Sequence, residues 1–140
     1  AGGVGWGEVE SDSFGINYGA VMQGHDERTT VMLKNVPNKY SKAALLSLID
    51  KHQCDYDFFY LPIDFRNKCN LGYAFINFRN PRSIVAFADY FSGKKWEHFK
   101  SDKVCLVSYA RIQGKESLVE HFRTSRLVHK HEKYCPLVLN

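Results

Sequence analysis

The sequence lacks the features that mark several large classes of protein. Its four cysteines are scattered without a C-x-x-C pair, which disfavours a zinc module or a redox dithiol and favours reduced, mostly buried thiols. No apolar run approaches the roughly 18 residues of a membrane span, and the first residues do not resemble a signal peptide. We therefore expect no membrane association and no secretion, but a location in the nucleus and cytoplasm.

A catalytic centre is missing as well. The six histidines are scattered, and no nucleophile, base and orienting group are placed together by the sequence. The segment His129-Lys130-His131 with Cys135 nearby is a poor metal site, because no fourth ligand stands in register. The sequence thus predicts no enzyme, no metal, no cofactor and no small-molecule substrate.

Charge is distributed unevenly along the chain. The formal net charge is +4, but five acidic residues and one basic residue fall within residues 1–28, so the remainder carries a net +8. An excess of that size favours a polyanionic partner and would steer its approach. Charge alone does not identify the partner, since many basic domains bind nothing charged.

The length of 140 residues suits one domain with tails. Residues 1–24 are rich in glycine and lack periodicity, which predicts a flexible leader or linker, although Tyr18, Val21 and Met22 could still dock on the domain. Residues 25–113 contain the alternating strand and helix patterns of the domain. Residues 114–140 are expected to extend it with a helix and a tail.

The elements expected in the domain follow from short β-branched or aromatic runs and from apolar residues at helical spacing. Strands are predicted at 30–36, 56–63, 71–78 and 103–109, and helices at 41–52, 81–93 and 115–128. The order βαββαβ predicts an α+β, ferredoxin-like sandwich, with a four-stranded antiparallel sheet, two helices on one face and the other face open, plus a C-terminal helix.

The third predicted strand carries the most specific motif. Residues 71–78 (LGYAFINF) match seven of the eight places of K/R-G-F/Y-G/A-F-V-x-F/Y, the RNA-contacting octamer of RNA-recognition-motif (RRM) domains, if Ile is counted for Val. Because side chains alternate along a strand, Tyr73, Phe75 and Asn77 should point to the open face. Two outward rings would form a platform on which bases stack. Alternatively, both are core aromatics beneath some other element.

The first predicted strand resembles the companion hexamer of RRM domains, as VMLKNV over residues 31–36. Met32 occupies the usual aromatic place, where a thioether can lie against a base without π-stacking. Lys34 shares the same face and can reach a phosphate, although a lone lysine on a strand is as often simply solvated.

On the second predicted strand, Phe58 and Tyr60 point outward and extend the aromatic surface if Phe59 and Leu61 point inward. A slip of one residue would reverse this, so both phases stay open. The basic residues expected at the rim of the face are Arg66, Lys68 and Arg111.

The predicted C-terminal helix leaves the fourth strand beside the open face. Its apolar stripe either packs on the sheet edge or lies across the face. If it covers the rings at 73 or 75, RNA must displace it, at a conformational cost.

A family resemblance extends beyond the two short motifs. The strings DERTT (26–30), KNVPNKY (34–40), YLPIDF (60–65), NKCN (67–70) and YARIQGK (109–115), together with the octamer, resemble the C-terminal RRM of the mei-two-like proteins of fungi and plants. The resemblance implies a regulator of meiosis whose RRM binds single-stranded RNA, including a non-coding RNA. The alternative is an RRM used mainly to bind a protein partner.

Overall fold

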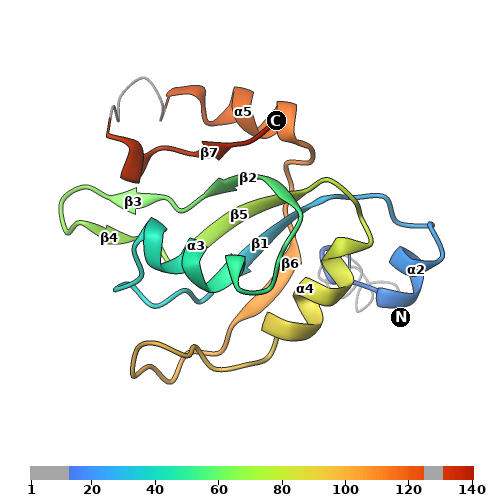
Figure 1. Ribbon diagram of the computed structural model, residues 1–140, viewed down its shortest axis with the longest axis horizontal. Coiled ribbons are helices and arrows are strands. Elements are labelled where there is room, and N and C mark those ends of the chain that lie inside the picture. The colour runs from blue at the N-terminus through green and yellow to red at the C-terminus, as the bar shows by residue number, and fades with distance from the viewer. Residues whose placement is uncertain (1–12, 125–130) are drawn as a thin grey trace, which may run out of the picture.

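A five-stranded antiparallel sheet organises the computed structural model, which describes residues 13–124 and 131–140 (Figure 1). Its strands, in spatial order, are β6 (Leu106–Tyr109), β1 (Thr30–Lys34), β5 (Tyr73–Phe78), β2 (Tyr56–Tyr60) and β7 (Leu137–Val138). The first four form the sheet expected from the sequence, so the ferredoxin-like fold is confirmed. The fifth strand, β7, was not predicted.

Two helices, α3 (Lys42–Asp50) and α4 (Ser83–Phe91), cover one face of the sheet (Figure 1). The hydroxyl of Ser41 accepts a hydrogen bond from the amide of Ala44 at 3.1 Å, which makes Ser41 the N-cap of α3. The helices bury apolar residues against the inward side chains of the strands, and this layer is the main core of the domain. The opposite face of the sheet is therefore where a ligand must be sought.

The second strand has the phase that points Phe59 and Leu61 into this core and Phe58 and Tyr60 to the opposite face. A β-bulge between Tyr56 and Phe58 changes the alternation, so that Tyr56 also faces the core. The strand ends at Tyr60, and the chain continues into a small hairpin of β3 (Ile63–Asp64) and β4 (Cys69–Asn70) that was not predicted.

The leader prediction is wrong for residues 13–24. This segment forms a short helix, α2 (Tyr18–Met22), whose Val21 is only 1% exposed, and Phe14 and Ile16 pack on the same core. The amide of Tyr109 donates to the carbonyl of Phe14 at 2.7 Å, so the leader also pairs with the outer edge of β6. Residues 1–12 lie outside the described part of the chain.

The C-terminal helix α5 (Lys115–His121) covers the first part of the predicted 115–128; residues 123–124 are helical again after a turn at Phe122, and residues 125–130 lie outside the described part. Beyond it, a 3-10 turn (Glu132–Tyr134) leads into β7, which pairs with β2. Helix α5 and strand β7 lie together along the β2 side of the sheet (Figure 1).

The cysteines form no disulfide, as expected, but only Cys105 is buried and the other three are half-buried. Burial raises the pKa of the Cys105 thiol to about 12 and that of Cys54 to about 11, so both are protonated near neutral pH.

No group of metal ligands occurs among the described residues, and no helix in that part of the chain has the length and apolar character needed to cross a bilayer.

Candidate nucleic-acid interface

The outer face of the sheet has an open half, formed by β1 and β5. The strand register places Phe75 opposite Met32 and Tyr73 opposite Lys34, so all four predicted contact residues are neighbours. The rings of Tyr73 and Phe75 meet edge to face, with centroids 5.7 Å apart. Both rings are half-buried, and Lys34 is exposed. The two rings therefore retain free surface on the face where the octamer motif predicts it.

A hollow of about 320 Å³ lies beside Phe75 in this open half. Residues from four parts of the chain line it: Phe14, Met32, Lys34, Phe75, Tyr109, Arg111 and Ile112. The guanidinium of Arg111 lies 5.3 Å from the centre of the Phe14 ring. The hollow thus combines aromatic and apolar walls with two cations, a set that suits a base and its phosphate.

The other half of the face is covered by α5. Phe58 is fully buried and Tyr60 is 7% exposed, and both belong to a second apolar cluster with Leu118 of the helix. Phe122, just after the helix, packs its ring 4.8 Å from that of Tyr60 and 5.0 Å from that of Phe75. The expectation that Phe58 and Tyr60 extend an exposed aromatic surface is therefore wrong for this conformation, because the C-terminal helix occupies them.

The junction before α5 directs the helix onto the face. The side-chain oxygen of Gln113 accepts from the amides of Thr29 and Thr30, and its nitrogen donates to the carbonyls of Thr30 and Ala110. Gly114 then turns the chain with φ +93°, a conformation that residues with a side chain rarely adopt. The junction is thus fixed to the start of β1, and α5 begins above the sheet.

Hydrogen bonds within the protein engage both polar atoms of the Asn77 side chain. Its carbonyl oxygen accepts hydrogen bonds from the hydroxyls of Thr29 and Thr30, both at 2.7 Å, and its amide nitrogen donates to the Asp57 carboxylate at 2.8 Å. The residue is 4% exposed. The prediction that Asn77 binds RNA is therefore wrong for the described conformation, in which the side chain joins β1, β2 and β5.

We expect Asn77→Ala to lower the free energy of unfolding by about 1–3 kcal/mol, because it leaves buried polar partners unpaired. Urea unfolding compared with that of Asn38→Ala, an exposed asparagine in a turn, measures the effect. An Asn77→Ala protein of unchanged stability that has lost RNA affinity would instead restore Asn77 as a contact residue.

The two rim cations of the hairpin lie apart from the hollow. Arg66 and Lys68 are exposed in the turn between β3 and β4, and neither lines the hollow. The ammonium of Lys68 lies 5.7 Å from the ring centre of Phe65 and 5.8 Å from that of Tyr134. Of the predicted rim residues, only Arg111 is brought to the hollow.

The sequence patterns did not identify several residues of the site. Phe14 lies in a segment without periodicity, so no pattern placed it beside the sheet. Ile112 stands next to a predicted contact, and Phe122 belongs to the apolar stripe of the C-terminal helix. Of these three residues, only Phe122 could have been suspected from the sequence, because the apolar stripe of the C-terminal helix can pack on the sheet face.

A charged cluster fixes the leader beside this site. The Arg28 guanidinium lies 3.8 Å from the Tyr109 ring centre and donates to the Asp26 carboxylate and to the carbonyl of Ser13. Hydrogen bonds from Arg28 lower the pKa of Asp26, while burial raises that of Tyr109 to about 12. The segment that contributes Phe14 to the hollow is therefore held in place by Arg28.

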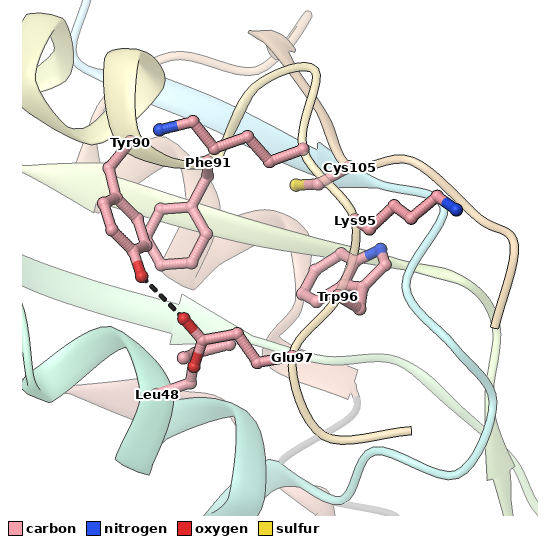
Figure 2. A pocket seen from close by; sticks show the side chains of 8 residues that line it. Leu48, Tyr90, Phe91, Lys95, Trp96, Glu97 and Cys105 are labelled. Atoms are coloured by element: carbon pink, nitrogen blue, oxygen red, sulfur yellow. Dashed lines mark hydrogen bonds between the residues drawn. The ribbon is translucent and has the colours of Figure 1, made fainter. Parts of the chain in front are cut away.

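A smaller cavity of about 90 Å³ lies on the other side of the sheet, between α4 and the segment that follows it (Figure 2). Trp96, Phe91 and Cys105 line it, and the Tyr90 hydroxyl donates to the Glu97 carboxylate at 2.7 Å. Lys94 and Lys95 line the cavity together with Glu97, but its volume is less than a third of that of the hollow on the sheet face, so it offers less room for a nucleotide.

The βαββαβ order, the sheet order and the octamer on the central strand define this chain as an RRM domain. Solved structures agree on the fold. The Rna15 RRM with bound RNA (GU) matches 67% of this chain and 96% of its own, with a TM-score of 0.53 and 19% identity. The Sex-lethal RNA recognition domains 1 and 2 of Drosophila melanogaster match 59% and 50%, with a TM-score of 0.50 and 20% identity.

The chain belongs to the RNA recognition motif 2 family, whose model matches residues 28–123. It is 50% identical to Protein MEI2-like 5 of Arabidopsis thaliana over 95% of the chain, and 52% identical to Protein MEI2-like 4 of Oryza sativa subsp. japonica over 86%. These matches confirm the resemblance to mei-two-like proteins, and the family is one of binding domains rather than enzymes. The chain spans 17% and 12% of the length of these two relatives.

Proposed function

We propose that this domain binds single-stranded RNA in the open half of the sheet face, with one base in the hollow beside Phe75. The observation that carries the proposal is the combination of a free aromatic surface with the two cations Lys34 and Arg111 around one hollow. Membership in an RNA recognition motif family supports it.

The chemistry of binding follows from this arrangement. A base that stacks on Phe75 or Tyr73 gains about 1–3 kcal/mol with little dependence on its identity. Met32, opposite Phe75 in the register, offers a polarizable surface to the same base. Lys34 and Arg111 can contact the adjoining phosphates, and Arg111 also offers a planar fork of donors. Helix α5 limits the platform on the β2 side.

Removing both cations tests the electrostatic part of the proposal. We expect Lys34→Gln with Arg111→Gln to weaken binding of a mixed single-stranded RNA and to reduce the salt dependence of binding. The slope of log K against log salt falls by about 1.4 if each cation contacts one phosphate. Fluorescence anisotropy at several salt concentrations measures it.

The matched control is Lys51→Gln with Arg82→Gln, which removes two exposed cations from the cap positions of α3 and α4 on the opposite face. This control should leave the slope nearly unchanged. Equal slopes for both double variants would show that RNA contacts neither Lys34 nor Arg111, and would exclude the hollow as the site.

We also propose that the whole protein regulates meiosis, acts in the nucleus and cytoplasm, and uses this domain to bind a non-coding RNA. The similarity to mei-two-like proteins supports this role, and the length of those relatives indicates that other regions contribute. Crosslinking of the full-length protein in meiotic cells, followed by sequencing of bound RNA, tests it. Recovery of coding transcripts alone would contradict the non-coding target.

The alternative use of this domain as a protein-binding module is not favoured, because the hollow beside Phe75 is basic and aromatic.

A further inference from the structure

A second hollow, of about 450 Å³, lies where the loop after β1 meets the loop that precedes β6. Its walls include the three lysines Lys39, Lys100 and Lys103, together with His98 and Phe99. Asp102 is close in sequence but does not line it, and no acidic side chain does. The hollow therefore presents positive charge to whatever enters it.

The three lysines are available for a ligand. The ion pairs among the described residues involve Arg28, Arg79 and Arg123, and none of them involves these lysines. All three lysine side chains are exposed. Converging cations without acidic partners repel one another, and a polyanion removes that repulsion on binding.

An aromatic ring lies among these cations. Phe99 is half-buried, and its ring meets the buried Tyr40 ring edge to face, with centroids 4.7 Å apart. The Trp96 ring packs against Tyr40 as well, with centroids 5.3 Å apart. Phe99 is thus held by its neighbours while part of its surface remains open. Cations interleaved with a fixed ring are the combination that single-stranded nucleic acids bind.

The second hollow lies close to the first along the chain. Lys34 lines the hollow on the sheet face, and Pro37, three residues later, lines the second one, so their Cα atoms are at most about 10 Å apart. The Asn35 side chain donates to the carbonyl of Val104 at 2.9 Å, which ties the end of β1 to the segment that follows Lys103. A single strand leaving the face past Lys34 therefore meets the basic hollow next.

We propose that the second hollow is an additional contact site for the same single-stranded RNA, with phosphates at the three lysines and one base against Phe99. This inference rests on the proposed function of the sheet face and adds to it the direction in which the strand runs. RNA that fills only the face hollow does not reach the lysines, whereas a longer strand does.

The test compares two RNA lengths on the full chain. Probes are a dinucleotide, which the face hollow and the adjoining ring can hold, and a mixed-sequence single-stranded RNA of about 12 nucleotides, within the range of site sizes of single-strand-binding domains. The variant carries Lys39→Gln, Lys100→Gln and Lys103→Gln. We expect its affinity for the long RNA to fall about tenfold, with the salt slope reduced by about 2, and its affinity for the short RNA to stay within about twofold.

A matched control carries Lys51→Gln, Arg82→Gln and Lys94→Gln, which removes as many exposed cations from the helix side of the domain. It should bind both RNAs as the native chain does. Phe99→Ala provides a second readout, since it should weaken only the long RNA without changing the salt slope.

Equal affinities of the triple variant and the native chain for the long RNA would overturn the inference. The same would hold if the triple variant lost only the binding of polyglutamate, which would assign the hollow to acidic protein segments. Failure of the native chain to bind the short RNA, with the long RNA still bound through the three lysines, would instead refute the proposed function of the face.

Discussion

Replacing Tyr73 and Phe75 together by alanine is expected to weaken the binding of single-stranded RNA by about 30-fold or more. Each stacked base contributes about 1–3 kcal/mol, and the two rings are the aromatic side chains of the octamer that face the open half of the sheet. Calorimetric titration of a short mixed RNA measures the loss.

Controls separate stacking from folding. Phe75→Leu keeps an apolar side chain beside Phe122 but removes the π-surface, so it should lose affinity while unfolding near the native urea midpoint. Tyr90→Ala removes a ring from the helix side and should leave affinity unchanged. If the double alanine variant is folded and binds as the native chain does, the two rings are not the platform.

Releasing α5 from the sheet is expected to produce the second large effect. Leu118 is fully buried and Phe122 contacts three rings of the face, so Leu118→Ala with Phe122→Ala removes the main apolar contacts of the helix. Each substitution of this kind costs about 2–5 kcal/mol where the site is well packed. Because α5 is a short terminal element, we expect it to detach while the remaining domain stays folded.

Two measurements identify this outcome. Amide hydrogen exchange should become fast in α5 while β1 and β5 stay protected. RNA affinity should rise, because the rings of Phe58 and Tyr60 become accessible for stacking and RNA no longer competes with the helix. A fall in RNA affinity with a folded domain would show that α5 forms part of the RNA site rather than a cover over half of it.

Much of the fold was predictable because the sheet obeys simple periodicities. The alternation that points Tyr73 and Phe75 to the open face requires Ala74, Ile76 and Phe78 to point into the core, and all three are buried there. The N-cap at Ser41 could be predicted from local chemistry. These features depend on neighbours in sequence, which is the information that patterns contain.

The parts that could not be predicted depend on contacts between distant segments. Asn77 faces outward, as alternation requires, but hydroxyls far away in sequence occupy its carbonyl oxygen. Phe58 is covered by α5, and the position of α5 depends on the hydrogen bonds that join Gln113 to the start of β1. Phe14 reaches the hollow through backbone pairing with Tyr109. In each case a tertiary contact decides whether a side chain on the sheet face is available to bind RNA.

The two outer strands of the four-stranded RRM sheet, β2 and β6, both pair with terminal segments of the chain. On one side β7 pairs with β2, and on the other the backbone at Phe14 bonds to Tyr109 of β6. Unpaired strand margins are templates for edge-to-edge aggregation. Removing either terminal segment to obtain a minimal domain should therefore leave β2 or β6 with an unpaired edge that promotes association. Preparations that begin after residue 24 or stop before residue 137 should self-associate at concentrations where the full chain stays dispersed.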